Sequence, residues 1–214
     1  MNRTIKILKD TALSLFIGKD YNSLSGDLFK ELKEYSSNIN KCFYNVKVLS
    51  SKNAINHYDR LTRCIVFDIY KDSINKKGKY TSFYHELGHH VDWELGLISN
   101  NELFRKTILM DCEYILNEFS IKSLILFIQK DSRTNGFSDI LSGATKNSFS
   151  FKYRHETSYW EGSIMRLSYE TFAHFYEALI RNDKFKINLY KKILPKAFDM
   201  FLYFIGEKDF TKAI

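Results

Sequence analysis

The pattern of apolar and polar positions changes along the chain, from alternation near the start to helical spacing in the second half. Alternating apolar residues predict strands at 43–49 and 62–70, of which the second is apolar on both faces. Apolar residues three and four positions apart predict one long or two shorter helices at 101–130, a helix at 168–181, and at least one more from 184 onward. Two short helices are expected before residue 40. These elements predict an α+β fold that is mainly helical, with a small mixed β-sheet.

The composition is typical of a folded globular protein. Hydrophobic residues make up 44% of the 214 positions and aromatic residues 16%, which is enough for a sizeable core. We divide the chain into an N-terminal cap of unknown role, residues 1–60, and a main domain, residues 61–214. Three cysteines, Cys42, Cys64 and Cys112, are odd in number and far apart, so they form neither a metal knuckle nor a disulfide framework. Reduced thiols in a cytosolic protein are the simplest interpretation.

The net charge of +7 comes from lysines and arginines scattered along the chain. They form no basic motif interleaved with aromatic residues, so we expect no specific nucleic-acid partner. No apolar stretch approaches the roughly 18 residues of a membrane span, so no membrane partner is expected either. The apolar run at 11–18 is short and is followed by no clear cleavage site, so secretion is not indicated and a cytoplasmic location is expected.

The clearest chemical signal is H-E-x-x-H, which lies between Tyr84 and Asp92. In a helix, His85 and His89 project from one face and can bind the same Zn²⁺. Glu86 lies about 100° farther around the helix. That position suits a general base acting on metal-bound water better than a third ligand.

The rest of this segment supports a buried helix beside the predicted sheet. Thr81 or Ser82 is expected to cap the helix, which ends near Gly96. Gly88 costs roughly 1 kcal/mol relative to alanine inside a helix, so its presence predicts the close approach of another helix or backbone. Asp92 either hydrogen-bonds the second nitrogen of a metal-binding histidine or is a plain surface carboxylate.

A catalytic zinc site needs three protein ligands and an open position for water. The predicted helix at 168–181 carries Glu170 and His174 four residues apart, and Glu177 two turns after Glu170. A carboxylate on a second helix is a common third ligand, so we choose Glu170. His174 and then Glu177 remain the alternatives.

Two segments precede that helix. Residues 136–144 predict a short helix or turn, with Ser138 or Asp139 as its cap. Residues 147–162 form a loop rich in aromatic residues that also contains His155. Long loops of this kind are often functional, so this one is expected to cover the metal cleft.

Four blocks of sequence carry a resemblance to a known family. They are residues 85–92, residues 138–145, His155 with the later pair Tyr159-Trp160, and residues 170–173. In this order they resemble the metallopeptidase-like domain of phage minor head (head-morphogenesis) proteins and of related prophage or toxin-associated proteins. More broadly they resemble gluzincins, in which two histidines and a downstream glutamate bind zinc. The likeness covers roughly residues 62–181 and implies a zincin-like fold, with the small sheet beside the H-E-x-x-H helix.

The resemblance implies roles for four residues. His85, His89 and Glu170 become the ligands of Zn²⁺, and Glu86 becomes the general base. In gluzincins with an E-x-x-x-D helix, the aspartate supports a zinc-binding histidine. This chain has His174 at that position.

Two supporting roles therefore stay open. Asp92 or Asp139 is expected to replace the missing support for a histidine ligand. The donor that stabilises the oxyanion is His155, Tyr153 or Tyr159, with His155 preferred.

The resulting hypothesis is a zinc-dependent metallopeptidase that cuts a peptide or protein substrate with zinc-activated water. Phage capsid or portal proteins, or a host target protein, are the implied partners, in the host cytoplasm or in a virion. The alternative is a catalytically silent, zinc-binding head-morphogenesis or accessory protein, in which zinc only stabilises the fold. A toxin that uses the same site on a host protein is a third hypothesis.

Overall fold

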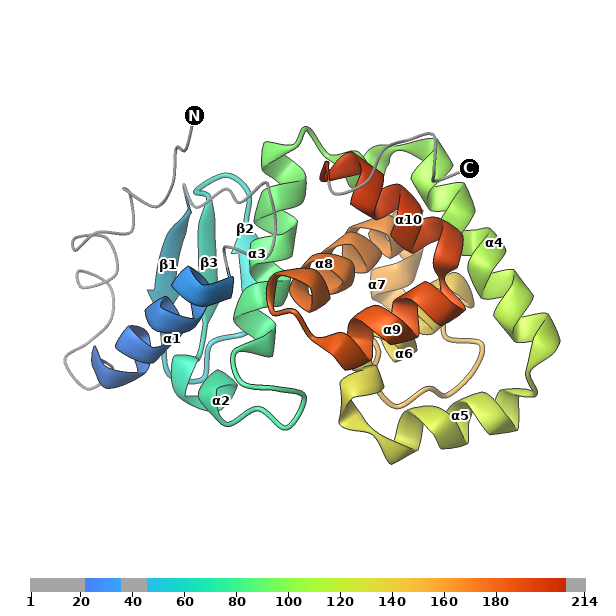
Figure 1. Ribbon diagram of the computed structural model, residues 1–214, viewed down its shortest axis with the longest axis horizontal. Coiled ribbons are helices and arrows are strands. Elements are labelled where there is room, and N and C mark those ends of the chain that lie inside the picture. Colours follow the sequence, from blue (N-terminus) through green and yellow to red (C-terminus); the bar gives the residue numbers. More distant parts are fainter. Residues whose placement is uncertain (1–21, 36–45, 207–214) are drawn as a thin grey trace.

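Helix α3 divides the molecule into a side with the sheet and a side made of helices, as the computed structural model shows (Figure 1). The structure describes residues 22–35 and 46–206. Its elements in chain order are α1 (Asn22–Tyr35), β1 (Lys47–Ser50), β2 (His57–Asp59), β3 (Cys64–Phe67), α2 (Ile69–Ser73), α3 (Thr81–Glu94), η3 (Ile98–Asn100), α4 (Glu102–Glu118), α5 (Ile121–Lys130), η4 (Ser132–Thr134), α6 (Asn135–Ala144), α7 (Thr157–Glu161), α8 (Arg166–Ile180), α9 (Lys184–Ile193) and α10 (Pro195–Phe204). The predicted α+β class, mainly helical with a small mixed sheet, is confirmed.

The sheet has the strand order β1–β3–β2, with β1 parallel and β2 antiparallel to the central strand β3. Ile65 and Phe67 of β3 and Val48 of β1 are buried in the core. The strand predicted at 43–49 is confirmed at its second half, and residues 43–45 lie outside the described residues. Strand β2 was not predicted. Since β1 and β2 precede residue 60, the sheet combines strands from both sides of the boundary drawn there.

The strand predicted at 62–70 ends early, at Phe67, because Asp68 starts a helix. Its carboxylate accepts hydrogen bonds from the backbone N–H groups of Tyr70 (3.1 Å) and Lys71 (3.2 Å). This satisfies two of the donors that a helix start leaves free. The alternating apolar pattern therefore overran the true end of the strand.

Helix α3 begins at Thr81, as expected, but neither Thr81 nor Ser82 caps it with a side chain. The buried carboxylate of Asp72 does so instead, accepting hydrogen bonds from the backbone N–H groups of Ser82 (3.0 Å) and Phe83 (2.9 Å). A negative charge at a helix N-terminus is favourable because of the helix dipole. The helix ends at Glu94, and Gly96 has the positive φ of 83° that suits the turn beyond it.

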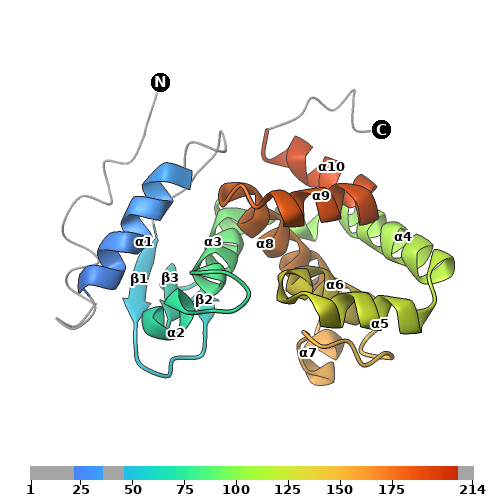
Figure 2. The same cartoon turned by 60° about the horizontal axis from the view of Figure 1, so that its bottom comes forward.

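Helix α8 is the centre of the helical side and packs directly against α3 (Figure 2). A Cβ added at Gly88 would lie 2.8 Å from the Cα of Ala173 on α8. The close approach predicted from Gly88 is therefore confirmed. On its other side, Phe175 of α8 contacts the rings of Tyr190, Phe198 and Phe201 from α9 and α10, at centroid distances of 4.8, 5.0 and 5.5 Å.

The remaining predictions about the chain have mixed outcomes. Residues 101–130 form two helices, α4 and α5, and α5 begins where the hydroxyl of Ser120 accepts a hydrogen bond from the N–H of Ser123 (3.2 Å). Cys64 is half-buried and Cys112 is buried, both as free thiols, whereas Cys42 lies outside the described residues. Within residues 22–35 and 46–206, no helix is long and apolar enough to cross a membrane.

Candidate metal centre

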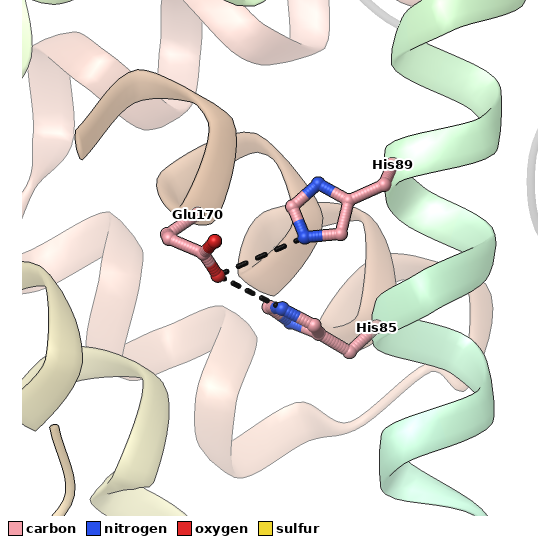
Figure 3. A group of neighbouring side chains, drawn as sticks. All are labelled: His85, His89 and Glu170. Carbon is pink, nitrogen blue, oxygen red and sulfur yellow. Dashed lines mark hydrogen bonds and ion pairs between the residues drawn. The ribbon is translucent and has the colours of Figure 1, made fainter. Parts of the chain in front are cut away.

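Two helices bring the three expected ligands together (Figure 3). His85 and His89 project from α3 toward α8, which carries Glu170. The Nε2 atom of His85 lies 3.0 Å from Oε2 of Glu170, and Nε2 of His89 lies 3.7 Å from the same oxygen. One ligand atom of each residue lies within 4.8 Å of the other two. The geometry therefore brings together all three residues chosen from the sequence as metal ligands.

These donors fit a zinc ion. Two imidazole nitrogens and one carboxylate oxygen are the donor types that Zn²⁺ accepts in three-ligand sites. The Nδ1 atom of His85 is buried and has no hydrogen-bond partner among the described residues. In the metal-free protein Nε2 donates to the carboxylate of Glu170, and a metal ion at Nε2 would require the proton to lie on Nδ1 instead.

The protonation of the three residues is strongly coupled. Burial, together with the nearby His174, lowers the pKa of His85 to about 4. Burial also acts to lower the pKa of His89, but the carboxylate of Glu170 outweighs it and raises that pKa to about 9. In spite of burial, the two histidines hold the pKa of Glu170 well below its usual value. Without a metal, His89 is thus protonated at neutral pH, and a metal that binds here displaces that proton.

Glu86 lies beside the three ligands and is not one of them. Only 8% of the residue is exposed. Burial raises the pKa of its carboxyl to about 7, although the charge of His89 partly opposes this. A carboxyl with a pKa near neutrality can both accept and return a proton, as a general base requires.

Ser138 or Asp139 was predicted to cap a helix, which is wrong: both lie inside α6, which begins at Asn135, and Asp139 points to the site. Its carboxylate accepts a hydrogen bond from the backbone N–H of His155 (3.0 Å), and both of its oxygens lie 3.0 Å from Nδ1 of that histidine. Nε2 of His174 lies 3.3 Å from the same carboxylate. With Nδ1 directed at Asp139, His155 is held with its Nε2 free. Its interaction with Asp139 raises the pKa of His155, against the effect of burial.

Tyr159 was one of three candidates for the oxyanion donor, and its hydroxyl donates to Oε1 of Glu170. Its ring stacks on that of His155, with 4.3 Å between the centroids. The third candidate, Tyr153, is held by its backbone: its N–H donates to the hydroxyl of Ser138 (3.0 Å), which donates to its carbonyl oxygen (2.7 Å). The loop at 147–162 thus contacts the site through His155 and Tyr159.

The two rival ligands form a layer behind His85. The ring of His174 lies 4.4 Å from that of His85, measured between centroids. Glu177 is fully buried and pairs with the ammonium of Lys186 (2.6 Å) and the guanidinium of Arg181 (3.3 Å). In spite of burial, the charge of Lys186 holds the pKa of Glu177 far below its usual value. His85, His174 and Glu177 also group within 4.8 Å, but the two cations beside the carboxylate make this group a poorer cation site.

Neither aspartate supports a histidine ligand as expected. Asp92 accepts hydrogen bonds from the backbone N–H (2.9 Å) and the hydroxyl of Ser99, in the turn after α3. Asp139 contacts His155 and His174, not His85 or His89. The support that gluzincins draw from an aspartate is thus not provided by either candidate.

Two adjoining cavities open the site to the surface. One, of about 230 Å³, is bordered by His89, Glu170 and residues 56–58 and 60, which belong to or flank the edge strand β2. The other, of about 280 Å³, lies on the side of His174. Both cavities are lined by Asn56, His85, Glu86 and His155, so the candidate metal ligands face a cleft that continues on two sides.

Sequence reasoning missed several contributors to the site. β2 borders the cleft but reads His-Tyr-Asp, with no apolar alternation to reveal a strand. Lys186 is fully buried against Glu177, whereas a lysine is expected at the surface, so its residue type gave no sign of this. Of the residues around the ligands, Asp139 was indicated by the sequence, because it lies in the block 138–145 that resembles metallopeptidase-like domains.

Comparisons of the chain with protein-family models, with curated proteins and with solved structures find no match. What the site does must therefore be argued from its geometry and chemistry.

Proposed function

We propose that this protein is a zinc-dependent metallopeptidase of the gluzincin type, with a zincin-like fold. The observation that carries the proposal is the meeting of His85 and His89 with Glu170, beside a buried Glu86 that is free to act as a base. Zn²⁺ in this site would lower the pKa of a water molecule and polarise the scissile carbonyl. The resemblance to phage minor head proteins and toxin-associated proteins suggests a capsid, portal or host protein as substrate.

The protein's own residues account for the proton transfers. Glu86 takes a proton from the attacking water and passes it to the amine that leaves. Its pKa of about 7 suits both steps. His155 is fixed by Asp139 at the edge of the cleft, where its Nε2 can donate to the oxygen of the attacked carbonyl.

The edge of the sheet offers a way to hold the substrate. β2 is an edge strand, paired on one side with β3, and its residues His57 and Tyr58 line the cavity that contains the metal ligands. An extended peptide can add to such an edge by backbone hydrogen bonds. This would place its scissile bond across the face of α3 that carries Glu86.

The test combines metal analysis with proteolysis. Wild-type protein should contain one zinc per chain, and His85→Ala and Glu170→Ala should lose it. Glu86→Gln should keep the zinc and lose about 10²–10⁴-fold in the rate of peptide cleavage. Glu102→Gln is the matched control, because Glu102 is exposed on α4 and pairs with Lys106 one turn away.

Two results would refute the proposal. One is full proteolytic activity in Glu86→Gln. The other is a zinc-loaded wild type that cuts no peptide of a mixed library while its melting temperature falls sharply on chelation. That second result would favour the structural role of zinc instead.

A further inference from the structure

The 280 Å³ cavity on the side of His174 has an unusual lining: every side chain that borders it carries a nitrogen or oxygen atom. It begins at His85 and Glu86 and extends to the loop before α3 and to the first turns of α3 and α6. The residues that border it away from the metal ligands include Asn56, Lys77, Ser82, Asn135, Tyr153 and Arg154. Such a lining disfavours an apolar substrate group, which would leave these polar atoms without partners.

Apart from Glu86, the proposed base, the carboxylates that border the cavity already have cationic or imidazole partners. Glu177 pairs with Lys186 and Arg181, both behind the cavity wall. Asp139 contacts the rings of His155 and His174. These carboxylates are therefore neutralised within the protein.

Lys77 is different. Its ammonium lies 5.0 Å from the centre of the Tyr153 ring, and no carboxylate of the described residues lies within 4.0 Å of it. Burial lowers the pKa of Lys77, while the nearby Asp139 partly restores it. A half-buried ammonium without an ion-pair partner is costly to maintain, so it suggests a partner that comes from outside the protein.

Two further groups can donate to that partner. The hydroxyl of Ser82 accepts a hydrogen bond from the side-chain amide of Asn75 (3.5 Å), and its own proton has no acceptor in the described part of the chain. Arg154 also borders the cavity and is exposed, and its guanidinium makes one long contact with the carbonyl oxygen of Phe149 (3.5 Å).

We propose that this cavity binds a carboxylate of the substrate next to the scissile bond, and that Lys77 selects it. The inference rests on the proposed peptidase function and names the substrate class. The carboxylate has two sources: the side chain of an aspartate or glutamate beside the cleaved bond, or the free C-terminus of a peptide. Charge-assisted hydrogen bonds from Lys77 and Ser82 would fix either one.

The main experiment uses two peptide mixtures of identical sequence, one with amidated and one with free C-termini, and identifies the products by mass spectrometry. An acidic side chain as the source predicts cleavage of both mixtures, with aspartate or glutamate preferred about 10–100-fold over asparagine or glutamine at one subsite. A terminal carboxylate predicts that only the free-acid mixture is cut, near its end. A preference for apolar residues, or no preference, overturns the inference while leaving the peptidase in place.

Variants of Lys77 test the assignment of the charge. Lys77→Met should abolish the acidic preference, and Lys77→Glu should turn it toward lysine or arginine. Lys76→Glu is the matched control, because Lys76 is the exposed neighbour in the same loop and does not border the cavity. An unchanged preference in Lys77→Glu, or an equal change in Lys76→Glu, overturns the role of Lys77.

A binding measurement separates this inference from the proposed function. N-acetyl-glutamate α-hydroxamate should bind the zinc-loaded wild type about tenfold more tightly than the glutamine analogue, and the N-acetyl-lysine analogue should bind most weakly. This order, lost in Lys77→Met, supports the cavity assignment even if no peptide is cut. Equal affinities, or no binding by any of the three, overturn it.

Discussion

Gly88 controls how closely the two ligand-bearing helices approach, so Gly88→Ala should separate them. The added Cβ would lie 2.8 Å from Cα and 3.0 Å from the carbonyl oxygen of Ala173. Ordinary contact begins at 3.4 Å, about 0.6 Å farther from the Cα. Both neighbouring atoms belong to the backbone and cannot rotate away, so α3 and α8 must move apart.

The expected size of the effect follows from two opposing contributions. Replacing a glycine within a helix by alanine stabilises it by roughly 1 kcal/mol. Overpacking in a close interface costs typically about 1–3 kcal/mol. Gly88→Ala should therefore lower the free energy of unfolding by about 1 kcal/mol. Since metal–ligand distances tolerate only about 0.2 Å, moving His85 and His89 away from Glu170 should also weaken zinc binding by at least about tenfold.

Urea denaturation of the metal-free protein measures the first effect, and competition with a chromophoric chelator measures the second. Gly26→Ala is the matched control, because Gly26 also lies in a helix, α1, and a Cβ there meets nothing within 4 Å. It should raise stability by up to about 1 kcal/mol and leave zinc affinity unchanged. If Gly88→Ala behaves like Gly26→Ala in both assays, the reasoning about helix approach is wrong.

Three further predictions concern single side chains of the site. Tyr159→Phe removes the hydroxyl that donates to Glu170 and should weaken zinc binding by about 10–100-fold in a competition titration; unchanged affinity would contradict the role of this contact. Glu177→Gln leaves the buried ammonium of Lys186 without its carboxylate and should cost about 3–5 kcal/mol in urea denaturation, of which the double variant with Lys186→Met should recover most. Because burial raises the pKa of Glu86 to about 7, its ionisation destabilises the metal-free fold as the pH rises from about 4.5 through 7. Metal-free Glu86→Gln should thus match wild type in stability at pH 4 and exceed it at pH 8, and equal stability at pH 8 would show that the carboxyl is not perturbed.

Local features of the sequence were enough to place two of the three candidate metal ligands. The four-residue spacing of His85 and His89 places them on one face of any α-helix, whatever surrounds it. The helix itself follows from local patterns, and its observed start at Thr81 agrees with the prediction. Gly88 predicted a close contact because a glycine destabilises a helix, and its presence is explained when another backbone lies too near for a side chain.

Local features could not separate Glu170 from its two alternatives, and it was chosen only because a carboxylate from a second helix is a common third zinc ligand. Glu170, His174 and Glu177 all lie on α8 and all carry suitable donor atoms. Which of them meets the two histidines depends on the rotation of α8 against α3, which is set by packing along both helices. The structure places Glu170 at the histidines, His174 behind His85, and Glu177 against Lys186.

The wrong cap of α3 and the missed strand β2 also result from contacts between segments far apart in the chain. Asp72 caps α3 from ten and eleven residues away along the chain, and β2 is a strand because it pairs with β3 and not because of its composition. By itself, the sequence determined the α+β class and the H-E-x-x-H helix, because helix geometry and apolar periodicity act over a few residues. Only the tertiary structure decided which residue of α8 meets the two histidines, where the edge strand lies and where the polar cavity opens, because these depend on contacts between segments far apart in the chain.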